Sequence, residues 1–372
     1  MRKVWTAFMV CLAVSALCGC GQKKEAAAPA GAAADTEAPA AQPEVKMGLI
    51  YIGPVGDGGW TFEHDKGRAY AAKETGIETI FKENVPEGPE SKEIMRNMID
   101  QGCNVIVATS FGYMDYMEEI AKEYPDVKFL HCSGYKQSEN MANYFGRMYQ
   151  PRYLSGIVAA MKTETGKIGY VAAFEIPEVI RGINAFTLGV RSIKPEAEVI
   201  VRWTHTWYDP AKEKAAAIAL LDEGCDVIAQ HQDTAGPQQA AEERGKWAIG
   251  YDSDMSKMAP KSNMTSPIWN WGPYYAEQVR AIQNGTWKSH AYWGSMKDGV
   301  VLLAPLTTLA PEGSQAKVDA AAKKIFDGSL VVFAGPILGQ DGNEKVPAGK
   351  AMTDQEMLSM DWFVQGVIGN AQ

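Results

Sequence analysis

The fold is decided by the stretch SKEIMRNMIDQGCNVIVATS, residues 91–110, which returns in altered form as EKAAAIALLDEGCDVIAQHQ, residues 213–232. Both copies place apolar residues at helical spacing, then glycine and cysteine, and then a short apolar run typical of a buried parallel strand. The glycine is suited to end the helix. We therefore expect Cys103 and Cys225 to enter two equivalent strands as small buried residues. Neither has the Cys-x-x-Cys partner typical of a zinc site.

Strand and helix patterns alternate on both sides of this repeat. The first half predicts strands at 47–52, 77–82, 104–108 and 127–131, with helices at 62–74, 90–101 and 112–123. The second half predicts strands at 167–172, 197–203, 226–230 and 246–250, with helices at 177–192, 211–223 and 235–244. Such alternation is typical of parallel sheets covered by helices, so the sequence predicts an α/β protein with two doubly wound lobes.

The division of the chain between the lobes follows from the same pattern. The N-terminal lobe is expected to comprise 46–148 plus 265–298, and the C-terminal lobe 149–264 plus 299–372. Crossovers near 148–150, 262–265 and 298–300 are the expected hinges, because a few strand-end residues absorb the rotation when two lobes close. Parallel sheets bind ligands outside the carboxyl ends of their strands, so we expect function in the cleft between the lobes.

The N-terminal region is typical of an export signal followed by a tether. Two basic residues precede the apolar run 4–17, which is short for a membrane span. The motif LCGC, residues 17–20, looks like a bacterial lipobox, which implies a signal peptide over 1–19 and lipid on the thiol of Cys20. A plain signal peptide is the alternative. The Ala/Pro-rich segment 20–45 has little to bury and is expected to be a flexible tether to the membrane.

The charge and cysteine content exclude several classes of protein. The formal net charge is −9, and loss of the signal with its two basic residues makes it −11, which does not suit nucleic acid. Beyond Cys20 the chain has three cysteines, and an odd number argues against a disulfide framework. We expect a monomer with no cofactor and no metal.

The loop GPVGDGGWTF, residues 53–62, joins the first expected strand to the first expected helix. Its glycine spacing is not that of a dinucleotide fingerprint, and it lacks the Gly-Lys-Ser/Thr ending of a P-loop. The indole of Trp60 is expected either beside a ligand or packed between helix and sheet. His64 lies one helical turn further on and shares that face, where it either donates to a ligand or joins a local hydrogen-bond network.

The other expected strand ends carry aromatic and acidic residues. The candidate ligand-binding residues are Asp57, Trp60, His64, Phe111, Glu175, Trp207, Asp233, Asp252 and Trp269. Core packing is the alternative for Phe111, and interaction with a helix dipole is the alternative for Glu175. Basic residues are scarce at these positions, with Arg181 the main exception, so the cleft suits a flat neutral ring better than a phosphate.

Aromatic stacking alone is not expected to supply the affinity. One base stacked on an aromatic side chain contributes roughly 1–3 kcal/mol. Micromolar binding needs about 8 kcal/mol. Carboxylates that accept hydrogen bonds from ring N–H groups are therefore expected to contribute.

Several motifs resemble those of the basic membrane protein family of substrate-binding lipoproteins, also called the purine nucleoside receptor family. They are the lipobox, GDGGWTFEHDKG (56–67), WYDPAKE (207–213), GYDSDM (250–255), TSPIWNW (265–271) and FAGPILGQDG (333–342). The resemblance implies a type I periplasmic binding protein fold, an extracytoplasmic location and a partner ABC importer permease. Family members hold a purine between two aromatic side chains, one from each lobe. The resemblance therefore implies this role for Trp60 and Trp207.

One motif departs from the family pattern. Nucleoside-binding members usually carry Thr-Ser-x-x-Lys, whose lysine helps to hold the ribose, whereas Trp269 stands at that position here. The aspartate of the Gly-x-Asp-Ser-Asp motif, on which nucleoside binding also relies, is kept as Asp252. An indole in the sugar pocket is expected to exclude ribose. The resemblance, with this departure, implies a free purine nucleobase as ligand.

Other functions stay open at this point. A cleft with aromatic and acidic residues also suits a sugar, and a surface lipoprotein could instead contact a sensor or a host partner. A nucleoside hydrolase is a further alternative, because paired carboxyl groups can cleave glycosides. No Ser-His-Asp arrangement and no strong metal motif stands out, so the sequence favours a binding protein over an enzyme.

Overall fold

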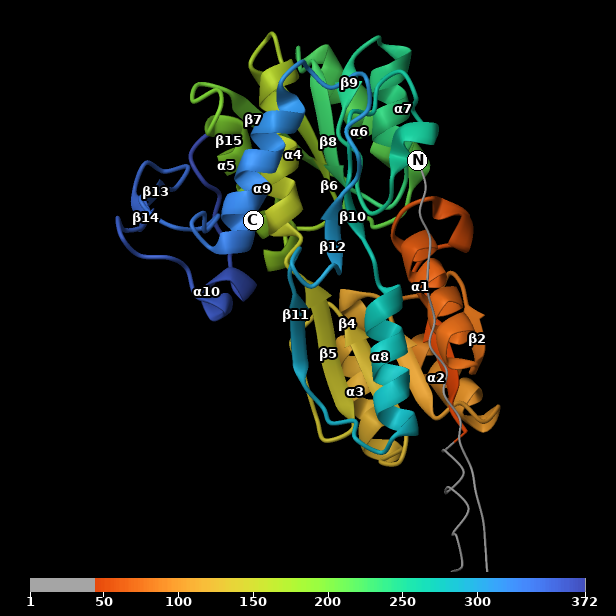
Figure 1. The fold of residues 1–372 in the computed structure, drawn as a ribbon. Coiled ribbons are helices and arrows are strands. Elements are labelled where there is room, and N and C mark those ends of the chain that lie inside the picture. The colour runs from red at the N-terminus through yellow and green to blue at the C-terminus, as the bar shows by residue number, and fades with distance from the viewer. Residues whose placement is uncertain (1–43, 372) are drawn as a thin grey trace, which may run out of the picture. The chain divides into compact units, whose positions relative to one another are not determined.

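Two sheets of parallel strands form the body of the protein (Figure 1). The structure is a computed structural model that describes residues 44–371. The predicted signal peptide, the lipidation site Cys20 and nearly all of the predicted tether lie outside the described residues.

The first sheet has the strand order β11-β5-β4-β3-β1-β2. Its strands are β1 (Lys46–Ile50), β2 (Glu78–Lys82), β3 (Val105–Ala108), β4 (Lys128–Cys132), β5 (Met141–Gly146) and β11 (Ala291–Gly294). The helices of this lobe are α1 (Trp60–Thr75), α2 (Glu90–Asp100), α3 (Met114–Glu123) and α8 (Gly272–Gln283). One buried cluster packs α2 and α3 against the sheet, while α1 packs beside α8.

The second sheet has the order β15-β7-β6-β8-β9. Its strands are β6 (Lys167–Ala172), β7 (Glu198–Trp203), β8 (Val227–His231), β9 (Trp247–Ala248) and β15 (Val367–Ile368). The helices of this lobe are α4 (Tyr149–Lys162), α5 (Pro177–Arg191), α6 (Pro210–Asp222), α7 (Gly236–Glu243) and α9 (Ser314–Asp327). The predicted pair of doubly wound parallel sheets is confirmed. Strand β9 is shorter than expected, and β5 and α4 were not among the predicted elements.

The remaining elements connect or extend the lobes. An antiparallel pair of β10 (Pro267–Trp269) and β12 (Val301–Leu303) lies where the chain passes between the sheets. The tail forms the pair β13 (Ile337–Leu338) and β14 (Glu344–Val346), and then helix α10 (Asp354–Leu358). The lobe boundaries and hinges expected from the sequence stay predictions.

The internal repeat has the same geometry in both lobes. Gly102 follows α2 with φ +91°, and Gly224 follows α6 with φ +94°, which is backbone that favours glycine. The next amide donates back into the helix, from Cys103 N to Met98 O at 3.0 Å in the first lobe. In the second lobe Cys225 N donates to the carbonyl of Leu220 at 3.1 Å. Both helices thus end in a Schellman motif, and both cysteines are buried as predicted.

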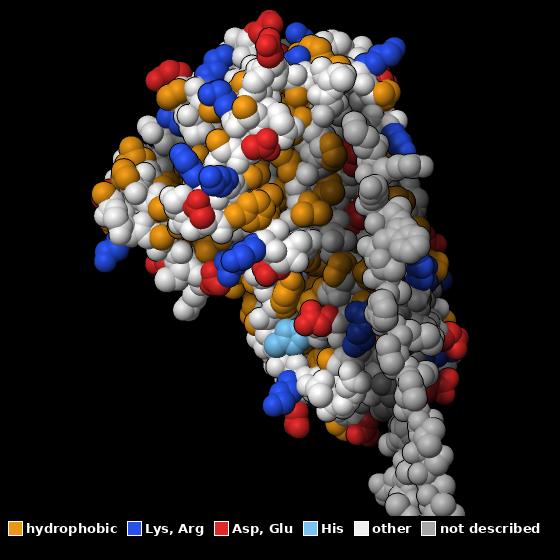
Figure 2. Space-filling view, in the orientation of Figure 1, with side chains coloured by type: hydrophobic (Ala, Val, Ile, Leu, Met, Phe, Trp, Pro, Cys, Tyr) orange, Lys and Arg blue, Asp and Glu red, His pale blue; other side chains and the backbone are white. Residues whose placement is uncertain are grey.

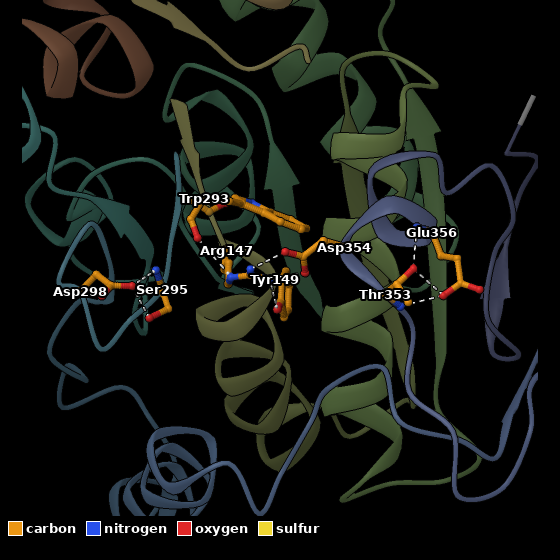
Figure 3. A network of polar contacts seen from close by, with 9 residues as sticks. Arg147, Tyr149, Trp293, Ser295, Asp298, Thr353, Asp354 and Glu356 are labelled. Atoms are coloured by element: carbon orange, nitrogen blue, oxygen red, sulfur yellow. Dashed lines mark hydrogen bonds and ion pairs between the residues drawn. The ribbon is translucent and has the colours of Figure 1, made fainter. Parts of the chain in front are cut away.

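The tail is tied to the chain segment between β5 and α4 (Figure 3). Arg147 in that segment makes a bidentate ion pair with Asp354 at the start of α10, with N–O distances of 2.8 and 2.7 Å. Its guanidinium also lies 4.3 Å from the ring centre of Trp293 and donates to the carbonyl of that residue. Thr353 and Glu356 cap α10 reciprocally, so the carboxylate of Asp354 is presented by an ordered helix end.

Acidic and basic side chains are interspersed on the face seen in Figure 2. Within residues 44–371, no helix has both the length and the apolar character needed to cross a membrane.

Candidate functional site

A pocket lies at the carboxyl ends of strands from both sheets. It holds about 320 Å³ of empty space, the part open to solvent included. Its lining residues are Ile52, Trp60, Ser110, Phe111, Ser133, Glu178, Trp207, His231, Asp233 and Tyr251. Each of these follows or ends a parallel strand, or lies in the first helical turn after one, because parallel strands deliver their carboxyl ends to one edge of a sheet.

Aromatic residues from both lobes border this pocket. Trp60 begins α1, is 8% exposed and donates from Nε1 to the carbonyl of Thr109 at 2.6 Å. Trp207 lies half-buried between β7 and α6, with its ring edge-on to Phe174 at 5.1 Å between centres. Phe111, after β3, adds a third ring to the lining. The two indoles named from the sequence thus border the same pocket.

The carboxylate of Asp57 serves the loop before α1 and does not line the pocket. Oδ1 accepts the amides of Gly59 and Phe62 at 2.9 and 3.0 Å, and Oδ2 accepts that of Thr61 at 2.8 Å. The free N–H groups at the start of α1 are therefore satisfied from within the chain, which leaves none of these three for a phosphate. Burial raises the pKa of Asp57 to about 6.

Three other candidates from the sequence are held inside the protein. His64 is fully buried between α1 and α8, where Nδ1 lies 2.6 Å from the hydroxyl of Tyr275 and the ring stacks on Trp271. Trp269 is 1% exposed and donates from Nε1 to Oδ1 of Asp252 at 2.8 Å. None of the three lines the pocket.

Glu175 also lies outside the pocket lining, 3.5 Å from Nδ1 of His205 in a partly exposed contact. The carboxylate that does line it is Glu178, one helical turn further along in α5. The sequence AAFEIPEVIRG contains both glutamates, and the start of α5 at Pro177 is the signal that places Glu178 in the first helical turn.

A chain of polar contacts crosses the cleft along one wall of the pocket. The hydroxyl of Ser133, after β4 of the first lobe, donates to Oε2 of Glu178 in the second lobe. Oε1 of Glu178 lies 3.4 Å from Nε2 of His231, which in turn lies 3.2 Å from the hydroxyl of Tyr251. Burial lowers the pKa of His231 to about 4, so this imidazole is neutral at pH 7.

Ser133, Glu178, His231 and Tyr251 were not among the candidates predicted from the sequence. His231 could have been predicted, because it is the last residue of the repeated strand. The side chains of Ser133 and Tyr251 follow strands in the same way. Their polar atoms can fix the orientation of a ligand.

Asp233 is the acidic group that the pocket leaves without a partner. It is 4% exposed, and Oδ2 has no hydrogen-bond partner. Burial raises the pKa of Asp233 well above its usual range, and the neighbouring carboxylates of Asp252 and Asp57 add to the effect.

A second hollow of about 760 Å³, open solvent included, adjoins the first and shares Phe111, Ser133 and Glu178 with it. It extends toward Trp293 and the tail residue Leu358. Among residues 44–371, no group of three or more His, Cys, Asp or Glu side chains is placed to hold a metal ion.

Comparison with known proteins places this arrangement in a family. Residues 44–332 match the family model Bmp, described as ABC transporter substrate-binding protein PnrA-like. A Brucella abortus protein named as purine-binding is 43% identical over 329 residues, which cover 88% of this chain and 94% of that protein. A Haloferax volcanii protein named as a putative ABC transporter glucose-binding protein is 40% identical over 87% of this chain and 81% of its own length.

Solved structures agree in fold. A solute-binding protein of an ABC transporter system from Aeropyrum pernix superposes with a TM-score of 0.69 at 19% identity, covering 77% of this chain and 92% of that one. A similar protein from Conexibacter woesei gives a TM-score of 0.63 at 23% identity, covering 77% and 98%. The type I periplasmic binding protein fold implied by the sequence motifs is confirmed. The chain belongs to the Bmp family of PnrA-like substrate-binding proteins of ABC transporters, which are extracytoplasmic receptors rather than enzymes.

Proposed function

We propose that this protein binds a free purine nucleobase in the pocket between its lobes and delivers it to the permease of an ABC importer. Trp60 and Trp207 come from opposite lobes and border the same space, so a planar ring has an aromatic side chain available from each. Two stacks supply roughly 2–6 kcal/mol, and hydrogen bonds to the polar wall add the rest of a micromolar affinity. The purine-binding relative from Brucella abortus supports the choice of ligand class.

The contact between Trp269 and Asp252 carries the preference for a base over a nucleoside. The indole fills the position of the family's ribose-binding lysine, and its Nε1 occupies Oδ1 of the aspartate on which nucleoside binding relies. Trp269 also stacks on Trp271 at 4.4 Å between ring centres, so it is held in place. A ribose would find neither the lysine nor a free Oδ1 there.

The test is calorimetry on unfolded and refolded protein, from which any copurified ligand has been removed. Adenine, hypoxanthine and guanine are titrated beside adenosine and guanosine. We expect at least one free base to bind more tightly than either nucleoside, and Trp207→Ala to weaken that binding by tenfold or more, about 1.4 kcal/mol. Tighter binding of adenosine than of every free base would refute the preference.

A sugar is the second candidate ligand, because the Haloferax volcanii relative is named as glucose-binding and its identity to this chain is nearly as high. Glucose in the same titration distinguishes the two candidates. Ultraviolet absorbance of the protein before refolding gives a second readout, since a bound purine absorbs near the protein band and glucose does not.

We further propose that the chain is exported as a lipoprotein, with signal peptide 1–19, lipid on Cys20 and a tether over 20–45. The supporting observations are the lipobox-like motif and the membership in a family of extracytoplasmic binding proteins. Expression with labelled palmitate tests this. Label is expected in the wild type and is expected to be lost in Cys20→Ser, whereas label retained in that variant would count against the anchor.

A further inference from the structure

The carboxyl group of Asp233 is buried at the pocket with no protein group to bind. No hydrogen bond and no ion pair of its side chain is found among residues 44–371, although the residue is only 4% exposed. An ionised carboxylate in such a place is strongly disfavoured unless a cation or several N–H donors face it.

The charged groups around Asp233 are other carboxylates. The four that raise its pKa are Asp252 after β9, Asp57 before α1, Glu213 in α6 and Glu87 before α2. Tyr208, in the segment before α6, also lies within electrostatic reach. No lysine or arginine lies within ion-pair distance of the Asp233 carboxylate in the described chain, so the proton is the positive charge available to it.

Those neighbouring carboxylates already have partners of their own. Asp57 accepts three backbone amides, and Asp252 accepts the indole N–H of Trp269. Glu213 accepts the hydroxyl and the amide of Thr234. Glu87 similarly accepts Ser110 Oγ and the amide of Gly112. Oδ2 of Asp252 is also unpaired, but Asp233 is the one of the five that lines the pocket with no hydrogen bond to its carboxyl group.

The burial of Asp233 depends on closure of the two lobes. Gly59, in the loop of the first lobe, lies so close to the carbonyl of Asp233 that a Cβ built on it would approach that oxygen to 2.2 Å. Ser253, also in the second lobe, donates to the carbonyl of Gly58 beside it. Separation of the lobes would remove these contacts and let water reach Asp233.

We propose that Asp233 takes up a proton when the lobes close, and that the resulting neutral acid selects a purine edge with a hydrogen-bond acceptor beside a donor. This inference rests on the proposed function. A protonated carboxyl group offers one O–H donor and one carbonyl acceptor, the same pattern as an asparagine amide. Adenine matches it with N7 and its exocyclic N6 amine, the edge that asparagine reads with two hydrogen bonds. The two-donor edge of guanine, N1–H with the N2 amine, suits an ionised carboxylate instead.

The proton comes from solvent, so affinity must depend on pH. In the open form Asp233 faces water and has an ordinary pKa of about 3.9, whereas closure raises the pKa. Protonation thus favours the closed, ligand-bound form. Ligand affinity falls by up to about tenfold per pH unit as the pH rises from the open-form pKa toward the raised pKa of the closed form.

Calorimetry in paired buffers of different ionisation enthalpy measures the protons taken up when adenine binds at pH 5.5 and 6.5. We expect uptake approaching one proton in the wild type. Asp233→Asn supplies the same donor and acceptor without needing a proton, so we expect it to bind adenine at pH 5.5 at least as tightly as the wild type, with that uptake lost. Asp254→Asn is the matched control, because this exposed carboxylate lies two residues after Asp252, and it is expected to keep the uptake.

Equal proton uptake by Asp233→Asn and the wild type would overturn the inference, as would tighter binding of guanine than of adenine without uptake. Both results leave a purine-binding protein in place. Failure of every purine to bind would refute the proposed function itself, and this inference with it.

Discussion

Under the proposed function, the side chain of Trp269 favours a free base over a nucleoside without lining the pocket. Its indole ring is packed between Trp271 and Trp60, and its one polar atom is used on Asp252. The pair satisfies two buried polar groups, and it also removes an aspartate oxygen from the cleft. An unpaired carboxyl group at this depth would be costly.

Trp269→Phe keeps an aromatic ring but removes the N–H donor to Asp252. We expect the free energy of unfolding to fall by about 1–3 kcal/mol, because a buried acceptor loses its partner. Urea denaturation at pH 7 measures the change. Trp287→Phe is the control, since that half-buried indole donates to Gln278 at 3.1 Å near the surface and should cost less. Equal losses in the two variants would contradict the reasoning.

Gly59→Ala tests the contact between the lobes. The added Cβ meets the carbonyl of Asp233 across the cleft, so full closure is expected to be blocked and ligand affinity to fall by tenfold or more, about 1.4 kcal/mol. Binding by calorimetry and the radius of gyration with ligand report the two effects. Gly56→Ala in the same loop is the control, because no atom lies within 4 Å of its Cβ position. An unchanged affinity for Gly59→Ala would show that the lobes do not need this contact.

At the scale of elements, the repeated helix and strand serve two different purposes. In both lobes the helix ends at a glycine with positive φ, and the cysteine after it is buried. Both features serve the fold rather than ligand binding. The residues just after each strand differ: Ser110 and Phe111 follow β3, whereas His231 and Asp233 stand at the end of β8. Two copies of one structural unit therefore supply different side chains to the same pocket, an aromatic ring from the first and ionisable groups from the second.

Glu213 connects α6 to the loop after β8 and makes stability depend on pH. Its buried carboxylate accepts Thr234 Oγ1 at 2.5 Å, and burial raises its pKa from 4.5 to about 7. The folded state therefore binds the proton more tightly than the unfolded state, and this contribution to stability, up to roughly 3 kcal/mol, is lost as pH rises from 4.5 to about 7.

Glu213→Gln should remove that dependence, because the amide does not titrate. Denaturation curves at pH 5 and pH 7.5 are expected to show a smaller loss of stability in the variant than in the wild type. Glu243→Gln, which changes an exposed glutamate paired with Lys214, should behave like the wild type. An identical pH dependence in all three proteins would exclude Glu213 as its source.

At the scale of the whole molecule, the tail beyond the family match contacts both the second sheet and the segment before α4. The match to the Bmp family ends at residue 332, and the tail after it adds β15 to the second sheet and reaches the segment between β5 and α4 through Asp354. Leu358 in the same tail also lines the hollow beside the pocket.

Asp354→Asn breaks the ion pair with Arg147. The pair is partly exposed, so stability should change by less than about 1 kcal/mol. Loss of this tether is expected to ease opening and to speed ligand dissociation, as measured by stopped-flow fluorescence of the pocket tryptophans. Asp341→Asn breaks a pair with Lys345 inside the tail and should leave dissociation unchanged. Equal ligand dissociation rates in the two variants would show that the contact between Asp354 and Arg147 does not affect opening of the lobes.

The alternation of strands and helices, the repeat and the family resemblance could all be predicted from the sequence, because they depend on local patterns of apolar residues and glycine. Trp60, Phe111, Trp207 and Asp233 could be placed near the pocket for the same reason, since a residue after a parallel strand lies at a known edge of the sheet. The edge strands β11 and β15 lie outside the regular alternation of strands and helices, and they pair with strands far away in the chain, so local patterns did not predict them.

The sequence by itself determined two related α/β halves and the edge of each sheet where a ligand can bind, because periodicity and turn residues act over a few neighbours. Only the tertiary structure decided which strand-end side chains face the pocket. The carboxylate of Asp57 accepts backbone amides at the start of α1, and Asp252 accepts the indole N–H of Trp269. Glu178 lines the pocket, whereas Glu175 does not. A buried polar side chain takes whichever partner packing brings within about 3 Å, and that partner is set by contacts between residues far apart in the chain.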